Sequence, residues 1–272
     1  MTDNELKITA AKVREGIVTA VYSAASGHPG GSLSAADMYT YLFFEEMNID
    51  PKNPRDPKRD RFVLSKGHTS PGYYSALANR GFFPVEDLKT FRKLGSYLQG
   101  HPCMNETPGV DMSSGSLGQG LSAATGMALA GKLKGEDYRV YTLLGDGEIQ
   151  EGQIWEAAMF AGAHKLDNLT VIVDNNDLQI DGRVADVCNI YPIDKKFEAF
   201  NFNVINIDGH DFAQIRDAFA KARETKGMPT AIIMKTTKGK GVSFMEDNAG
   251  WHGKAPNAEE YEKAIAEIRS AI

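Results

Sequence analysis

Two oxygen-rich segments in the middle of the chain carry side chains suited to binding a divalent cation. Residues 145–148 (GDGE) stand at the end of the apolar run 138–145, and residues 174–177 (DNND) stand at the end of the run 169–174. The glycines beside Asp146 allow a sharp turn in which the backbone approaches a ligand closely. About thirty residues separate Asp146 from Asn176, which is the length of one strand–helix–strand unit. Both residues are therefore expected at the same edge of a parallel sheet.

These two segments predict a metal-bridged diphosphate. Carboxylate, amide and carbonyl oxygens are the ligands that Mg²⁺ prefers, and Mg²⁺ usually takes phosphate oxygens for the rest of its shell. Asp146 and Asn176, together with backbone carbonyls, would hold the cation. The alternative is an ordinary turn, because Asn and Asp are common turn residues and Asp146 could simply cap the helix that follows.

Histidines in glycine-rich segments are the second chemical signal. Four of the six histidines lie in such segments, at His28, His68, His101 and His252. Imidazoles on such loops can bind sugar hydroxyls, carbonyls or phosphates, and they can transfer protons near neutral pH. Their spacing does not fit a zinc site. Each could also be an ordinary surface histidine.

Two further segments are candidates for ligand contacts. Residues 113–120 (SSGSLGQG) precede a small-residue helix, so free backbone N–H groups are expected to face an anion or a heteroaromatic ring. A flexible linker is the alternative. Residues 235–241 (KTTKGKG) lack the residue order of a P-loop and are expected to form a mobile loop near the site. His210 is expected to be a loop residue beside Asp211, the better helix cap.

The elements that must position these residues alternate between helices and strands. Helical periodicity covers residues 3–25, 34–46 (with Ser34 as a plausible cap) and 257–271, whereas three prolines and dense charge indicate an exposed loop at 48–61. Five short apolar runs indicate buried parallel strands at 62–65, 138–145, 169–174, 202–208 and 229–235. The alternation predicts an α/β fold, an open and mostly parallel sheet with helices on both faces, whose ligands gather beyond the carboxyl ends of the strands. Residues 1–272 are expected to form a single domain.

Composition narrows the classes of partner. The chain has 272 residues, of which 42% are hydrophobic, and a formal net charge of −6, which argues against a basic nucleic-acid module. Its two cysteines form no CxxC pair, so neither a disulfide framework nor a thiolate zinc site is indicated. No signal peptide and no apolar run of ~18 to 20 residues is present, so a cytoplasmic protein without membrane partners is expected.

Seven motifs together resemble the amino-terminal, thiamine diphosphate-binding half of the transketolases. In chain order they are SGHPGG at 26–31, SKGH at 65–68, GHP at 100–102, GSLGQG at 115–120, GDGEIQEG at 145–152, DNN to IDG at 174–182 and WHG at 251–253. They span nearly the whole chain. The GDG and NN motifs are general to thiamine diphosphate enzymes, whereas SGHPGG, GHP and GSLGQG indicate the transketolase branch.

The resemblance implies roles for individual residues. Mg²⁺, with Ca²⁺ or Mn²⁺ as substitutes, would be held by Asp146, the Asn176 side chain and the Leu178 carbonyl. The residues implied to contact thiamine diphosphate are His68, Gly115, Ser116, Leu117, Gly147, Asn176 and His252. The histidines implied to face the sugar, as catalytic residues, are His28, His68, His101 and His252. Ser116 is a departure, because the family usually has proline there, and Glu151 and Glu156 would lie at a dimer interface.

The resemblance also implies a partner. Complete transketolases continue into a pyrimidine-binding domain, which carries the activating glutamate, and a carboxyl-terminal domain. These domains are expected on a separate C-terminal transketolase subunit, with self-association across a dimer axis to give two copies of each chain, a heterotetramer. The implied reaction transfers a two-carbon ketol unit from a ketose phosphate to an aldose phosphate, as in the pentose phosphate pathway of carbohydrate metabolism.

Two alternatives to this function remain open from the sequence. A subunit of another thiamine diphosphate enzyme, such as an oxo-acid dehydrogenase or a deoxyxylulose-phosphate-type synthase, would share the GDG and NN motifs. The histidine-bearing loops argue against the dehydrogenase. A non-catalytic, cofactor-binding protein with a regulatory or scaffolding role is the second alternative.

Overall fold

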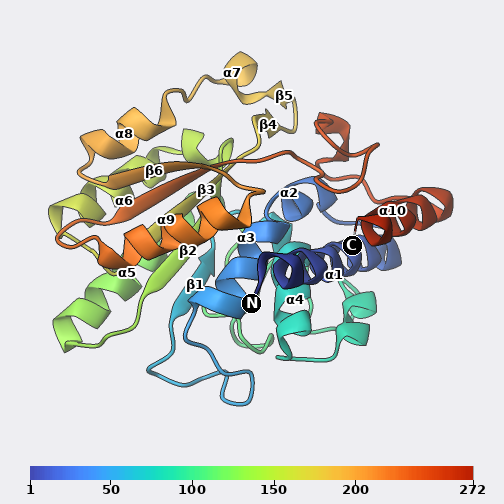
Figure 1. Ribbon diagram of the computed structural model, residues 1–272, viewed down its shortest axis with the longest axis horizontal. Coiled ribbons are helices and arrows are strands. Elements are labelled where there is room, and N and C mark those ends of the chain that lie inside the picture. Colours follow the sequence, from blue (N-terminus) through green and yellow to red (C-terminus); the bar gives the residue numbers. More distant parts are fainter. Residues whose placement is uncertain (272) are drawn as a thin grey trace.

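A parallel five-stranded sheet organises the chain, as a computed structural model that describes residues 1–271 shows (Figure 1). Its strands are β1 (Arg61–Leu64), β2 (Val140–Gly145), β3 (Leu169–Asn175), β6 (Asn203–Asp208) and β7 (Thr230–Lys235). All neighbours pair in parallel, in the order β1-β2-β3-β7-β6. A small antiparallel hairpin of β4 (Leu178–Gln179) and β5 (Gly182–Arg183) follows β3. The five predicted strands are confirmed, with bounds that differ by at most two residues.

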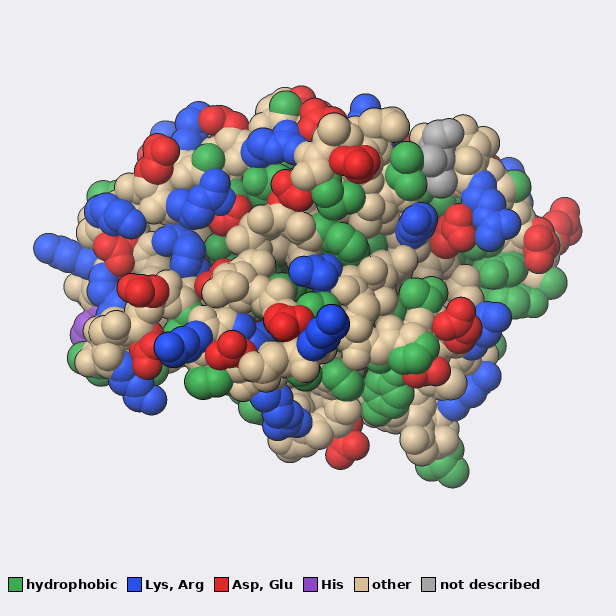
Figure 2. Space-filling view, turned by 60° about the horizontal axis from the view of Figure 1, so that its bottom comes forward, with side chains coloured by type: hydrophobic (Ala, Val, Ile, Leu, Met, Phe, Trp, Pro, Cys, Tyr) green, Lys and Arg blue, Asp and Glu red, His purple; other side chains and the backbone are tan. Residues whose placement is uncertain are grey.

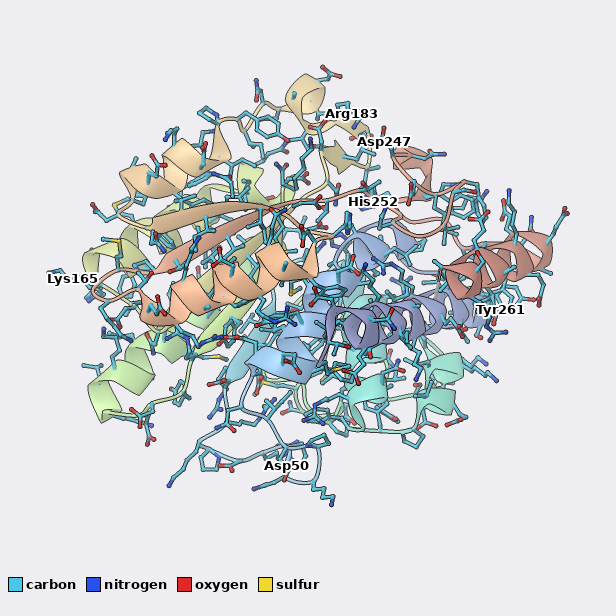
Figure 3. All side chains as sticks on the ribbon, in the orientation of Figure 1. Asp50, Lys165, Arg183, Asp247, His252 and Tyr261 are labelled. Carbon is cyan, nitrogen blue, oxygen red and sulfur yellow. The ribbon has the colours of Figure 1, made fainter. Side chains whose placement is uncertain are left out.

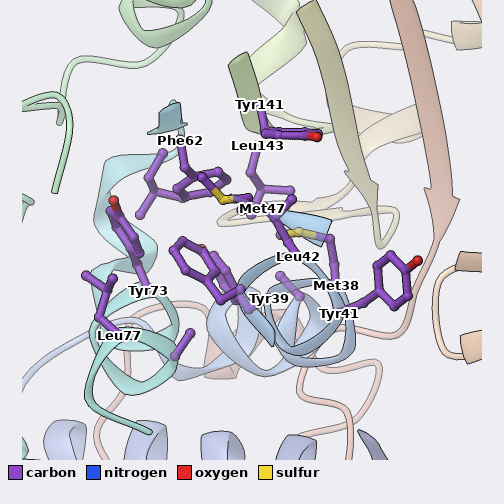
Figure 4. Close-up of a cluster of buried hydrophobic side chains, with 14 of the residues drawn as sticks. Met38, Tyr39, Tyr41, Leu42, Met47, Phe62, Tyr73, Leu77, Tyr141 and Leu143 are labelled. Carbon is purple, nitrogen blue, oxygen red and sulfur yellow. The ribbon is translucent and has the colours of Figure 1, made fainter. Parts of the chain in front are cut away.

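Helices cover both faces of this sheet, which confirms the predicted fold class. On one face lie α5 (Gln119–Lys134), α6 (Gly152–Ala163) and α8 (Ile193–Ala199), whose apolar side chains share a buried cluster with Val171 and Val173 of β3. On the other face, α3 (Ala36–Tyr41), α4 (Ser70–Arg80) and α9 (Phe212–Glu224) share a cluster with Ile172 (Figure 4). The alternation along β3 is that of a strand buried on both sides.

A third group of helices flanks the sheet. The long helix α1 (Asp3–Ala24) packs against α4 and against α10 (Ala258–Ser270), as Figure 1 shows. Both α1 and α10 begin with a capping box, at Thr2 and Asn257, which satisfies backbone N–H groups at their first turns. The remaining helical elements are short: α2 (Pro29–Ser34), η1 (Leu42–Glu46), η2 (Gly67–Thr69), η3 (Val85–Thr90), η4 (Glu148–Gln150), α7 (Val184–Val187) and η5 (Ala249–Trp251).

The predicted helix at 34–46 is confirmed over residues 36–46, but its predicted start and its cap at Ser34 are wrong. Helix α2 begins at Pro29, whose fixed φ and missing N–H suit the first turn of a helix, and it ends at Ser34. Helix α3 starts afresh at Ala36 and continues into a single π-helical turn, η1. The Ser34 hydroxyl does not cap a helix; it donates to the Asp174 carboxylate at 2.6 Å.

Two burial predictions also need correction. Strand β6 is partly exposed along its length; it is one of the two edge strands of the sheet, and the other, β1, is mostly buried. The 48–61 segment is largely exposed, as predicted, but Arg59 and Asp60 are buried at its end. Lysine, arginine and acidic side chains mix over the face shown in Figure 2. Within residues 1–271, no helix combines the length and apolarity needed to cross a membrane.

Candidate functional site

The structure brings Asp146 and Asn176 together at the carboxyl ends of β2 and β3. Gly145 and Asp174 are paired in register at the ends of these strands, so the two oxygen-rich turns follow side by side. The Asp146 carboxylate accepts the N–H of Gly147 at 2.8 Å and also the N–H of Asp177, which belongs to the second turn. Asp146 and Asn176 are only 2% and 7% exposed. The predicted proximity of the two segments is therefore confirmed.

The charged form of Asp146 is disfavoured at this site, so a bound cation would stabilise it. Burial raises the pKa of Asp146, and the nearby Asp174 carboxylate raises it further. The Leu178 carbonyl, the third predicted metal ligand, accepts a hydrogen bond from the Lys238 ammonium at 2.9 Å. Within the described chain, no cluster of three or more His, Cys, Asp or Glu side chains could hold a metal, so an amide and a carbonyl oxygen would have to complete a site here. One carboxylate, one amide and one carbonyl form a donor set that fits Mg²⁺.

A buried ion pair next to this site holds Asn176 in place. The Asp174 carboxylate accepts from the Lys66 ammonium and from the Asn176 amide nitrogen, the latter at 2.9 Å. Burial alone would raise the pKa of Asp174, but the Lys66 ammonium and the hydrogen bonds from Lys66, Ser34 and Thr236 together outweigh it and the pKa is lowered. The Asn176 amide thereby turns its oxygen away from Asp174, towards the N–H of Leu178 at 3.2 Å. Sequence reasoning missed the role of Lys66, although a buried aspartate at a strand end needs a partner.

Three of the four predicted histidines form one cluster. The ring centroids of His28 and His68 are 5.0 Å apart, and His252 lies 5.5 Å from His28 and 5.3 Å from His68. Burial is the main cause that lowers the pKa of His28 to about 4, of His68 to about 2 and of His252 to about 3. All three are therefore neutral near pH 7. The buried Nδ1 atom of His28 has no hydrogen-bond partner among the described residues.

His101 lies beside this cluster and is more exposed. A Cβ atom added to Gly115 would stand 3.1 Å from the His101 ring, and one added to Gly67 would stand 2.7 Å from the Gly115 nitrogen. The SKGH and GSLGQG motifs are thus packed backbone against backbone at Gly67, where only glycine fits, and the His101 ring of the GHP motif packs closely on Gly115. Burial lowers the pKa of His101 as well, and the Arg92 guanidinium lowers it further.

The loop before α5 is held by a carboxylate of the protein. Gly118 has φ +86° and donates its N–H to Glu148 at 3.0 Å. This N–H was predicted to face a ligand, so that prediction is wrong for Gly118. Ser116 and Leu117 are exposed, as are Glu151 and Glu156 near the start of α6. Glu148 belongs to the GDGE segment, but sequence reasoning missed its contact with Gly118, because the separation of the two residues along the chain does not predict it.

Lys238 is a site residue that sequence reasoning missed. Its side chain is 2% exposed, and its ammonium donates to Leu178 and, at 2.8 Å, to Nδ1 of His252. The 235–241 segment that carries it is packed rather than free: the Gly239 N–H bonds to the Gly30 carbonyl. Arg183 also ties the β4–β5 hairpin to this part of the chain by donating to Asp247 at 2.6 Å (both residues are labelled in Figure 3).

His210 lies outside the site and has a structural role. Its Nδ1 atom lies 2.8 Å from the Asp37 carboxylate, which also accepts from Arg14. Asp211 caps α9, as predicted. A cavity of about 730 Å³ adjoins His210 at the ends of β6 and β7, and it is lined by none of the residues predicted for cofactor, metal or sugar.

Comparisons with known proteins agree with this geometry. Residues 6–270 match the family described as "Transketolase, thiamine diphosphate binding domain". The 6-deoxy-6-sulfo-D-fructose transketolase subunit SqwG of Clostridium sp. (strain MSTE9) is 47% identical over 242 residues, which are 89% of this chain and 88% of that protein. Phocaeicola vulgatus has an apulose-4-phosphate transketolase subunit that is 42% identical over 267 residues, or 98% of this chain and 95% of that protein.

A solved structure shows the same fold inside a longer chain. The transketolase of Campylobacter jejuni superimposes with a TM-score of 0.93 and 38% sequence identity. The match covers 99% of this chain but only 43% of that transketolase. The chain therefore has nearly the length of the two bacterial subunits and less than half the length of the single-chain relative.

Proposed function

This chain belongs to the transketolase family of thiamine diphosphate-binding domains, and on that premise we propose that it is the cofactor-binding subunit of a two-chain transketolase. The observation that carries the proposal is the buried pair of Asp146 and Asn176 at neighbouring strand ends, with Leu178 bonded through its N–H to the Asn176 amide oxygen. Relatives named as transketolase subunits match it over almost their whole length.

The metal and the diphosphate are assigned to the buried turn. Asp146, the Asn176 amide oxygen and the Leu178 carbonyl would bind Mg²⁺, and Gly147 would contact the diphosphate through its backbone. Ca²⁺ or Mn²⁺, which also bind oxygen donors, would substitute. The Lys238 ammonium, already at the Leu178 carbonyl, adds positive charge where an anionic diphosphate would lie. The residues assigned to the rest of the cofactor are His68, Gly115, Ser116, Leu117 and His252.

The histidine cluster handles the protons of the sugar. When bound, thiamine diphosphate supplies the carbon nucleophile of the reaction. His252 is neutral and accepts from Lys238 at Nδ1, so its remaining proton is on Nε2, which can donate to a carbonyl oxygen. His28, with its buried Nδ1 atom that no described residue contacts by a hydrogen bond, can bind a sugar hydroxyl and accept its proton. His68 and His101 complete the set of groups that face the substrate.

The partner chain is assigned to the surface around the cofactor loop and α6. Apolar side chains are exposed in the cofactor loop (Leu117, 38%), on α6 (Met159, 56%, and Phe160, 40%) and in the turn between β4 and β5 (Ile180, 69%). Residues 1–272 would supply one domain, and a C-terminal transketolase subunit would supply the pyrimidine-binding and carboxyl-terminal domains. Glu151 and Glu156, both exposed on this side, would lie at the dimer axis of an assembly with two copies of each chain, in the cytoplasm.

The substrate class is a ketose that carries a terminal anionic group, paired with an aldose acceptor. The two bacterial relatives are named for a sulfonated fructose and for apulose 4-phosphate. A ketose phosphate, as used in the pentose phosphate pathway, is the default donor. The relatives do not favour the oxo-acid dehydrogenase, the deoxyxylulose-phosphate-type synthase or the non-catalytic alternative, since they are named as transketolases.

A binding measurement and an activity assay test this function. Calorimetric titration of the chain with its partner subunit should show Mg²⁺-dependent binding of thiamine diphosphate, and the same pair should convert a ketose donor with an aldose acceptor but not pyruvate with an electron acceptor. Asp146→Ala should abolish metal-dependent binding, whereas Glu136→Ala, at an exposed position before β2, should leave it intact. Unchanged binding by Asp146→Ala would refute the metal assignment.

A further inference from the structure

Glu148 is a buried carboxylate that joins three segments of the chain. Its Oε1 atom accepts from the Ser65 hydroxyl and, at 3.0 Å, from the Gly118 N–H, and its Oε2 atom accepts from the Gly145 N–H at 2.9 Å. The side chain is 3% exposed. Among the described residues, no lysine, arginine or histidine forms an ion pair with it. Three hydrogen bonds therefore compensate the carboxylate directly, and the Lys66 ammonium, which is paired with Asp174, adds only a longer-range attraction.

Each of the three donors lies next to residues assigned to the cofactor. Ser65 precedes His68 in the SKGH motif, Gly118 ends the loop that carries Gly115, Ser116 and Leu117, and Gly145 precedes Asp146. A carboxylate that accepts three donors fixes their positions relative to one another more firmly than isolated contacts would.

The Glu148 carboxylate also stabilises the start of helix α5. Helix α5 is 16 residues long, and its N-cap residue, Gly118, makes no side-chain cap. The negative charge of Glu148 at this end interacts favourably with the positive pole of the helix. Movement of Glu148 would therefore shift the loop 115–118 together with the first turn of α5.

We propose that Glu148 is a positioning residue for thiamine diphosphate: it ties the 115–118 loop and the end of β1 to the turn that carries Asp146, and thereby sets the affinity for the cofactor. The inference rests on the proposed function. It predicts a split between binding and turnover, because Glu148 holds cofactor-binding segments and is not itself placed against the reacting atoms.

The test compares two isosteric substitutions of buried carboxylates. Glu148→Gln replaces one acceptor oxygen with an NH₂ group that faces a donor. Asp60→Asn is the matched control, since Asp60 is 6% exposed and accepts two backbone N–H groups, from Asn48 and Arg139 at 2.8 Å each, at the opposite end of β1. Both should lower the melting temperature. Only Glu148→Gln should also raise the Kd for thiamine diphosphate with Mg²⁺, by about 10- to 100-fold.

The measurement uses the full chain with its partner subunit, by calorimetric titration and by activity at varied cofactor concentration. At saturating cofactor, kcat of Glu148→Gln should stay within about threefold of the original chain, because uniform binding is lost and transition-state contacts are kept. If the original chain binds cofactor and the Kd of Glu148→Gln equals that of Asp60→Asn, the inference is overturned. If the original chain and its partner bind none, the proposed function fails instead.

A second variant keeps the inference testable if Glu148→Gln does not fold. Ser65→Ala removes one donor and leaves the Gly118 and Gly145 contacts to Glu148. It should raise the Kd for thiamine diphosphate by about 3- to 10-fold, in line with the typical net contribution of one hydrogen bond. An unchanged Kd for Ser65→Ala would refute the positioning role.

Discussion

Gly120→Ala is expected to push the first turn of α5 away from the end of β1. A Cβ atom at Gly120 would lie 2.5 Å from the Ser65 Cα atom and 2.7 Å from its Cβ atom. Non-bonded carbon atoms need about 3.5 to 4.0 Å, so the helix or the strand end must move by about 1 Å. Ser65 presents its backbone at the end of a buried strand and cannot turn aside as a flexible side chain could.

The expected loss of stability follows from two opposing effects. Overpacking a close contact costs up to about 3 kcal/mol, and alanine is better than glycine inside a helix by about 1 kcal/mol. The net loss in the free energy of unfolding is about 2 kcal/mol. Gly126→Ala is the matched control, because it makes the same change in the same helix at an exposed position with no atom within 4 Å. It should gain about 1 kcal/mol.

Thermal unfolding and cofactor titration of the two variants provide the assay. A difference of about 3 kcal/mol corresponds to roughly 6 to 12 °C in Tm for a chain of this size. Because loop 115–118 leads into this turn, Gly120→Ala should also weaken thiamine diphosphate binding, and Gly126→Ala should not. If Gly120→Ala were as stable as Gly126→Ala or more stable, the close packing of α5 on the end of β1 would be refuted.

Two further predictions concern the histidines and a buried ion pair. His252→Ala or His28→Ala should slow turnover with the partner subunit by ~10²- to 10⁴-fold while the circular dichroism spectrum is unchanged, and near-full rates in both variants would rule out their role with protons. Burial alone would raise the pKa of Asp37, but Arg14 and His210 outweigh it and lower the pKa from 3.8 to about 2. Ionised Asp37 therefore stabilises the fold above pH 3.8, and this stabilisation is lost as the pH falls towards about 2. Asp37→Asn should lower the free energy of unfolding by about 2 kcal/mol near neutral pH, and this difference should shrink in acid. Urea unfolding that shows the same difference at both pH values would contradict the direction of the pKa shift.

Local patterns in the sequence were enough to predict the sheet and the meeting of Asp146 with Asn176. Apolar runs identify strands buried on both faces, and parallel strands place their carboxyl ends together. One strand–helix–strand unit separates the two turns, so their proximity needs no knowledge of distant parts of the chain. The glycine-rich loops that carry His28, His68 and His252, and the resemblance of these motifs to the transketolases, predicted that the three histidines share one site. The structure brings them together.

The residues that sequence reasoning missed make contacts between distant parts of the chain. Lys66 bonds to Asp174 over a separation of 108 residues, and Ser65 bonds to Glu148 over 83. Spacing along the chain does not constrain such pairs, because they depend on the order of strands in the sheet. The start of the helix predicted at 34–46 was wrong for a local reason, since Pro29 starts a helix earlier and the segment divides at Ala35. Roles of individual residues towards cofactor and metal stay predictions.

The place of β7 in the sheet has a consequence for a chain still emerging from the ribosome. This strand is the last of the five to be made, yet it lies between β3 and β6. Until residues 230–235 have been synthesised, β3 and β6 each present an open edge, which is a template for aggregation. Lys238 and His252 follow in the same late stretch. The synthesis of this stretch thus both fills the gap in the sheet and adds Lys238 and His252 to the site. A nascent chain interrupted before it would be prone to aggregate and would lack these site residues.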